Sequence, residues 1–107
     1  MSGDTMNPAA FRASLSEDTP PPGLAVPLQA LWWSGKGRWE LAHELAQSVE
    51  DRDGAWVHAH LHRVEGDLAN AAYWYRRAGR NVCTTPIGAE WCALSAAMLP
   101  SASDVDG

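Results

Sequence analysis

The stretch from Gly54 to Arg80, GAWVHAHLHRVEGDLANAAYWYRRAGR, constrains the fold of this chain more than any other segment. Apolar residues recur every three or four positions on both sides of Gly66, which is the spacing of one face of a helix. Gly66 suits the left-handed conformation that ends a helix, and the side chain of Asp67 can cap the next helix. The stretch therefore predicts a hairpin of two helices, 55–65 and 68–78.

Three further helices are predicted on the same grounds. Two of them cover residues 25–34 and 38–49, and the last begins after Thr84-Thr85-Pro86, where Thr85 is the expected cap and Pro86 the first helical residue. In the turn before residue 55, Asp53 is the expected cap. The apolar positions of the five helices are expected to face the core, and they include Leu28, Leu31, Trp32, Trp39, Ala42, Ala46, Val57, Leu61, Val64, Leu68, Ala71, Trp74, Tyr75, Ala78, Ile87, Trp91, Leu94 and Met98.

Composition divides the chain into three parts. Residues 1–23 contain a run of three prolines and scattered small polar residues, so they are expected to form a flexible arm apart from the core. Residues 24–100 hold the predicted helices, and the small, acidic residues 101–107 are expected to be a disordered tail. With 107 residues in all, the chain has room for one domain.

A weak internal repeat links the two halves of the helical part. When Leu28 is aligned with Val57, a shift of 29 residues, Gly37 falls on Gly66 and Ala42 on Ala71. Helix pairs that repeat every 20 to 50 residues cover their apolar faces by stacking on each other. The predicted fold is therefore all-α, a compact stack of two helical hairpins plus a C-terminal helix.

The segment GDLANAAYWYRRAGR resembles the second helix of tetratricopeptide and Sel1-like repeats. That helix has the form Gly-Asp-x-x-x-Ala followed by an aromatic-Tyr-Arg-Lys-Ala run, which is matched here by Gly66, Asp67, Ala71, Trp74, Tyr75, Arg76 and Ala78. The wider block 31–80 is similar to a group of small bacterial proteins. The resemblance implies a TPR-like stack and, because such repeats often receive extended peptides or acidic chain ends, it implies peptide binding.

Charge and composition exclude several classes of function. The formal net charge of −5 argues against nucleic-acid binding, which needs a basic surface. No apolar run approaches the roughly 20 residues of a membrane span, and the first residues lack the pattern of a signal peptide, so we expect a cytoplasmic protein with no membrane partner. Cys83 and Cys92 are too few and too far apart for a zinc framework of paired CxxC elements.

Histidines form the first candidate site. On a helix, His58, His62 and Glu65 fall within about 60° of one another, and histidines at i and i+4 can share a metal ion. Glu65 is a third ligand or a hydrogen-bond partner of an imidazole nitrogen, and His43 completes the set if the hairpins stack suitably. The signal is weak, because HxxxH is common by chance and histidines at the edge of a core are often structural. Here His60 points away from the pair, and a packing role beside Trp56 is expected.

A polar stripe on the predicted helix 68–78 forms the second candidate site. Asn70, Tyr73 and Arg77 lie at i, i+3 and i+7, where an amide, a phenol and a guanidinium can hold a peptide or a carboxylate. A solvated helix face is the alternative. Trp33, next to the inward-facing Trp32, is expected at the surface as a further anchor for a partner.

The leading hypothesis from sequence is a protein without catalytic residues that binds a protein or peptide segment, including an acidic one, and needs no cofactor. The alternative is a metal-dependent or acid/base enzyme centred on His43, His58, His62 and Glu65, with a divalent transition metal such as zinc. A self-associating homo-oligomer is the third alternative.

Overall fold

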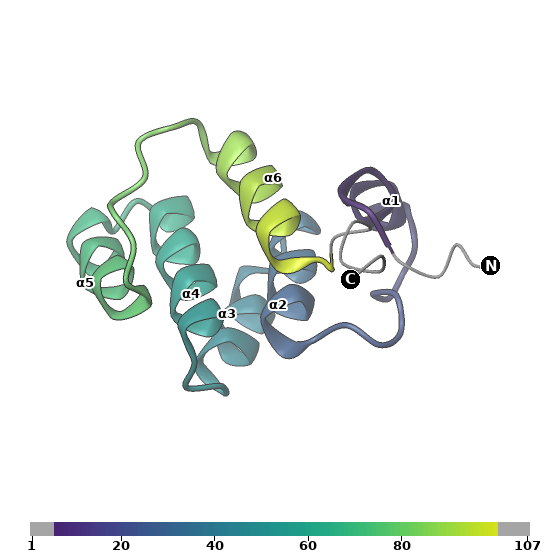
Figure 1. Cartoon of the computed structure of the whole chain (residues 1–107), viewed down its shortest axis with the longest axis horizontal. Coiled ribbons are helices and arrows are strands. Elements are labelled where there is room, and N and C mark those ends of the chain that lie inside the picture. The colour runs from purple at the N-terminus through teal and green to yellow at the C-terminus, as the bar shows by residue number, and fades with distance from the viewer. Residues whose placement is uncertain (1–5, 101–107) are drawn as a thin grey trace, which may run out of the picture.

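The computed structural model describes residues 6–100 of the chain, and these residues form only helices and the loops between them, so the all-α prediction is confirmed (Figure 1). The elements are α1 (Pro8–Ala13), η1 (Ser14–Ser16, a 3₁₀ turn), α2 (Val26–Gly35), α3 (Trp39–Gln47), α4 (Arg52–Glu65), α5 (Leu68–Ala78) and α6 (Ile87–Met98). In this part of the chain, every helix is too short or too polar to cross a bilayer.

Four of the helices form two hairpins. The pair α2 and α3 turns at Gly37, and the pair α4 and α5 turns at Gly66, where both glycines have positive φ angles of 80° and 88°. Helix α4 lies at the centre of the molecule and contacts α2, α3, α5 and α6 (Figure 1). Side chains that α4 presents on different faces therefore meet residues from several elements.

Two helix starts differ from the prediction. The cap of α4 is Asp51 and not Asp53: the Asp51 carboxylate accepts a hydrogen bond of 2.7 Å from the amide of Gly54, so the helix begins three residues earlier. At α6, Pro86 occupies the capping position and Thr85 makes no cap, because proline at this position leaves the chain extended before Ile87. Asp67 does cap α5, as predicted, by accepting from the amide of Asn70 at 3.3 Å.

The core lies where α4 crosses α2 and α6. Its fully buried large side chains come from five helices and include Phe11, Leu31, Trp32, Val57, Leu61, Tyr75 and Leu94. Three predicted core residues are exposed instead. Val64 is 43% and Leu68 66% exposed because both lie beside the turn between α4 and α5, and Ile87 is 37% exposed in the first turn of α6. Hydrophobic spacing identifies the apolar face of a helix, but it does not show which residues of that face extend beyond the neighbouring helix and are exposed.

The N-terminal segment packs against the core, which differs from the expected arm apart from it. Asn7 caps α1, and Phe11 is fully buried in a stacked contact with Trp91 of α6, with 5.4 Å between ring centroids. Next to it, the indole NH of Trp32 donates a hydrogen bond of 3.0 Å to the Ser14 hydroxyl. Leu15 also packs against the core, and the Lys36 ammonium donates hydrogen bonds to the carbonyls of Leu15 and Glu17, so several contacts dock this segment. The predicted tail, residues 101–107, lies outside the described residues, as do residues 1–5.

Candidate metal centre and polar network

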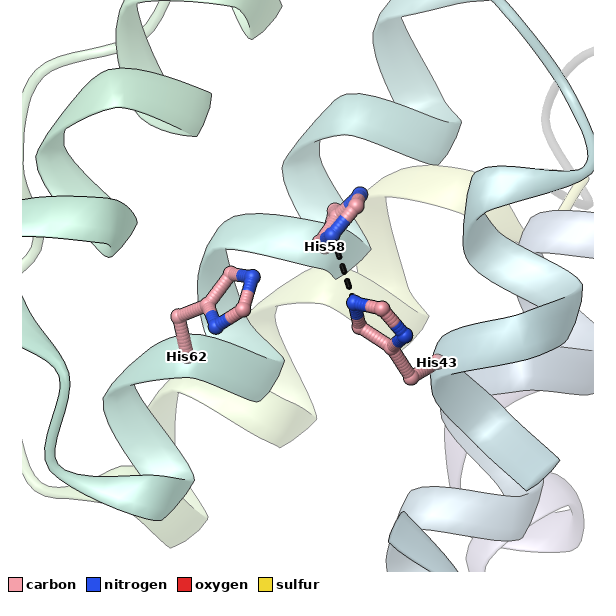
Figure 2. A group of neighbouring side chains, drawn as sticks. All are labelled: His43, His58 and His62. Atoms are coloured by element: carbon pink, nitrogen blue, oxygen red, sulfur yellow. Dashed lines mark hydrogen bonds between the residues drawn. The ribbon is translucent and has the colours of Figure 1, made fainter. Parts of the chain in front are cut away.

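Three histidines from two helices converge between α3 and α4. His58 and His62 are one turn apart on α4, and His43 faces them from α3 (Figure 2). The Nε2 atoms of His43 and His58 are 2.9 Å apart, and one nitrogen from each of the three rings lies within 4.8 Å of the others. The structure therefore brings together the histidines that the sequence pattern had grouped.

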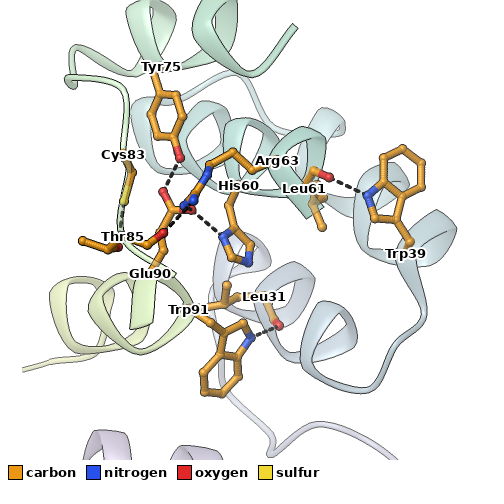
Figure 3. A network of polar contacts seen from close by, with 10 residues as sticks. All are labelled: Leu31, Trp39, His60, Leu61, Arg63, Tyr75, Cys83, Thr85, Glu90 and Trp91. Atoms are coloured by element: carbon orange, nitrogen blue, oxygen red, sulfur yellow. Dashed lines mark hydrogen bonds and ion pairs between the residues drawn. The ribbon is translucent and has the colours of Figure 1, made fainter. Parts of the chain in front are cut away.

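Aromatic rings hold these histidines in place. Trp39 stacks on His43 with 4.8 Å between centroids, and Trp74 of α5 stacks on His58 at 3.8 Å. The indole NH of Trp39 donates a hydrogen bond of 2.7 Å to the carbonyl of Leu61, which ties α3 to α4 (Figure 3). The rings are thus fixed in their mutual geometry before any ligand binds, which lowers the entropy cost of binding.

Glu65 orients the third histidine. Its carboxylate accepts a hydrogen bond of 2.7 Å from Nδ1 of His62, and the other nitrogen of that ring, Nε2, is turned toward His43 and His58 (Figure 2). A carboxylate on the outer nitrogen of a ligating histidine fixes the tautomer and raises the basicity of the inner nitrogen. Of the two roles predicted for Glu65, the structure favours the one behind the histidine.

Burial favours the neutral form of His58 and His43. Desolvation, followed by the nearby His43 and His62, lowers the pKa of His58 from 6.5 to about 4. Desolvation and His62 also lower the pKa of His43. A neutral imidazole has a free lone pair, which is the form that binds a metal ion. At neutral pH, His43 and His58 are therefore ready to act as ligands.

This pKa shift predicts a pH dependence of stability in the metal-free protein. Unfolded His58 takes up a proton near pH 6.5 but folded His58 does so only near pH 4, so the free energy of unfolding falls as the pH is lowered between these values. His43 acts in the same direction. We expect urea unfolding midpoints, measured with a chelator present, to fall across this window. The fall should be smaller for His58→Asn, and equal slopes for the two proteins would contradict the assignment.

The distances suit one small metal ion. Nitrogen atoms bound to a tetrahedral Zn²⁺ at about 2.0–2.1 Å lie roughly 3.3 Å from each other. The observed spacings, 2.9 Å for one pair and at most 4.8 Å for the others, bracket that value. The chemistry also fits, because imidazole is a preferred ligand of zinc, copper and nickel.

The residues predicted to bind a partner are only partly brought together. On α5, Arg77 donates a hydrogen bond of 2.9 Å to the Tyr73 hydroxyl, so these two form a unit. The Asn70 amide instead turns back to Asp67 of its own cap, at 3.4 Å. Trp33 lies on α2, half-buried with its ring edge-on to Trp32. The structure therefore leaves Tyr73 and Arg77 as a local pair, with Trp33 on a different helix.

A cavity of about 620 Å³ is lined by one of the three histidines, His58. It is bounded by the turn between α3 and α4, by the first turns of α4 and by α5, with the lining residues Ala46, Gln47, Val49, Glu50, Asp51, Arg52, Ala55, His58, Trp74 and Arg77. His58 thus belongs both to the histidine cluster and to the cavity wall. Arg77, predicted as a partner-binding residue, lines the same cavity.

A second polar cluster, centred on Glu90 of α6, was missed from the sequence. The buried Glu90 carboxylate contacts Nδ1 of His60 and Nη1 of Arg63, both at 2.8 Å, and also accepts a hydrogen bond from the Tyr75 hydroxyl (Figure 3). His60 was predicted to have a packing role beside Trp56, but its ring meets this carboxylate. The available signal was a lone glutamate between apolar positions of α6, but the sequence does not show which helix it faces.

The pKa values of this second cluster follow from its contacts. Burial alone raises the pKa of Glu90, but hydrogen bonds from His60, Tyr75 and Arg63 outweigh it and hold the value at about 2. Burial and the Glu90 carboxylate raise the pKa of the Tyr75 hydroxyl well above its usual range. At neutral pH, Glu90 is ionised and Tyr75 is a hydrogen-bond donor. The cluster joins α4, α5 and α6 through the Glu90 carboxylate, while the buried Nε2 of His60, on the far side of that ring, makes no hydrogen bond within the described residues.

Fold and site together define an all-helical protein that carries three converging histidines beside a surface cavity. No protein-family profile, curated protein or solved structure matches the chain. The resemblance of residues 66–80 to tetratricopeptide and Sel1-like repeats therefore stays a prediction.

Proposed function

We propose that this protein binds a divalent transition metal ion through His43, His58 and His62. The observation that supports the proposal is the convergence of three imidazole nitrogens within 4.8 Å, with two of the rings buried. Glu65 behind His62 and the stacked rings of Trp39 and Trp74 add the second layer of contacts that metal-binding histidines usually have.

The ligand set favours a site with one open position. Closed structural zinc sites use four protein ligands, mostly cysteines, whereas three histidines leave a place for water or another small ligand. Three neutral imidazoles also leave the full charge of the ion uncompensated, which makes it a stronger Lewis acid. We therefore propose Zn²⁺ as the ion, and an exchangeable ligand or substrate as its fourth partner.

Cobalt substitution tests the proposal directly. Co²⁺ replaces Zn²⁺ in such sites, and its visible absorption is intense only when the coordination is tetrahedral or nearly so. Titrating untagged, metal-free protein with Co²⁺ should give a visible spectrum that saturates at one equivalent and is abolished by added Zn²⁺. A titration that produces no protein-dependent absorption, with no metal retained after gel filtration, would falsify the proposal.

A second candidate function is the binding of an acidic peptide, proposed because Arg77 and Trp74 both line the cavity of about 620 Å³. Fluorescence anisotropy of a labelled aspartate-rich hexapeptide measures it. Binding to metal-free protein with a dissociation constant below about 100 μM, weakened tenfold in Arg77→Gln, would support this function. The absence of binding to metal-free protein would exclude it.

A further inference from the structure

The cavity of about 620 Å³ and the histidine cluster share one residue, His58, which lines the cavity while its Nε2 lies 2.9 Å from that of His43. We propose that the cavity receives a small, elongated dicarboxylate, with one carboxylate on the metal ion and the other on Arg77. The inference rests on the proposed metal centre and specifies the class of ligand that fills its open position.

The length of the ligand is inferred from the contacts of Trp74 with His58 and with Arg77. Trp74 stacks on His58 with 3.8 Å between centroids, and the guanidinium carbon of Arg77 lies 5.2 Å from the Trp74 ring centroid. Trp74 therefore contacts both the Arg77 guanidinium and the His58 ring. We expect the span from the metal to Arg77 to exceed the reach of one carboxylate and to suit a dicarboxylate with a short chain between its ends.

The cavity offers an apolar surface for that chain. Ala46 and Val49 at the end of α3, Ala55 on α4 and the Trp74 ring all line it. Methylene groups placed there lose contact with water, which favours binding. A ligand with apolar middle and charged ends matches this lining better than a compact inorganic anion does.

The charges of the lining balance until the metal binds. Arg52 and Arg77 oppose Glu50 and Asp51, and the Asp51 carboxylate is already engaged with the amide of Gly54. The metal ion then adds two positive charges at one end of the cavity, which favours a dianion. Arg77 uses one NH group for Tyr73 and keeps the others for a carboxylate, which a guanidinium can bind through two parallel hydrogen bonds.

Ligand length gives the test. Co²⁺-loaded full chain is titrated with glutarate and, separately, with acetate, while the visible spectrum reports any change at the metal. We expect glutarate to reach half-saturation at a concentration at least tenfold lower than acetate, because only glutarate spans to Arg77. In Arg77→Gln the advantage of glutarate should vanish while the response to acetate is unchanged.

The control is the neighbouring arginine. Arg76 is exposed on α5, and the Arg76→Gln variant should keep the preference for glutarate. Arg77→Lys keeps the positive charge but loses the paired donors of the guanidinium, so it should keep part of the preference for glutarate. The Co²⁺ spectrum of each variant before ligand addition shows whether the metal site is retained. If acetate and glutarate act at equal concentrations, or if both glutamine variants behave alike, the dicarboxylate inference is overturned although the metal centre stands. If Co²⁺ gives no spectrum at all, both proposals fail.

Discussion

Replacing His43 with alanine is expected to lower the affinity of the protein for Zn²⁺ by at least about 100-fold. Loss of a residue behind a ligand typically weakens metal binding by about 10- to 100-fold, and the loss of a ligand itself should exceed that. His43 is the best position because its side chain is only half-buried, so the substitution disturbs the core least. Competition with a chromophoric chelator measures the affinity.

Two further variants serve as comparisons for the loss of Zn²⁺ affinity in His43→Ala. Glu65→Gln removes the carboxylate behind His62 and should cost roughly tenfold in affinity. Glu44→Ala, at an exposed position next to His43, should bind Zn²⁺ like the wild type. Circular dichroism of each variant shows that the helices are intact. A His43→Ala protein that binds Zn²⁺ as tightly as the wild type would place the metal elsewhere.

Replacing Glu90 with glutamine is expected to destabilise the fold by about 3 kcal/mol or more. The change removes the charge from the buried centre of the second cluster and leaves the Arg63 guanidinium without its counter-ion, which typically costs about 3–5 kcal/mol. Since a domain of this size is usually stable by only about 5–15 kcal/mol, the shift in urea midpoint should be large. Glu40→Gln, on the exposed face of α3, should change stability by less than about 0.5 kcal/mol.

The Glu90 carboxylate should also make the stability of the protein depend on pH in the acid range. The pKa of folded Glu90 is about 2, below the roughly 4.3 of an unfolded glutamate, so its contribution to stability is complete above the higher value. This contribution is lost as the pH falls toward the pKa of folded Glu90. Wild-type protein should therefore lose stability between these values faster than Glu90→Gln does. Parallel curves for the two proteins in that range would show that the carboxylate is not held as the structure indicates.

Local signals in the sequence were sufficient for both ends of α5 and for the C-terminal end of α4. The limits of α5 were predicted correctly, because a capping aspartate precedes Leu68 and a glycine with positive φ follows Ala78. The pairing of His58 with His62 also follows from spacing alone, since both lie on one helix. The place of His43 depends on how the two hairpins pack, and helical spacing within one segment carries no information about that packing.

Contacts between distant segments were not predictable. Glu90 is 30 residues from His60, and their contact depends on the path of the loop before α6. The spacing of apolar residues shows which face of a helix is buried. It does not show which other helix covers that face, because several helices offer a similar apolar area. Phe11 illustrates the same limit, because prolines and polar residues dominate its surroundings in sequence although its ring is fully buried against α6.

The docking of α1 has a practical consequence for experiments on this protein. A recombinant fragment cut at the start of α2 would strip the Phe11 ring from Trp91 and leave the Trp32 indole without its hydroxyl partner. Such a fragment should be prone to aggregation and proteolysis. Expression boundaries and affinity tags therefore belong ahead of Asn7, where they leave the first helical cap intact.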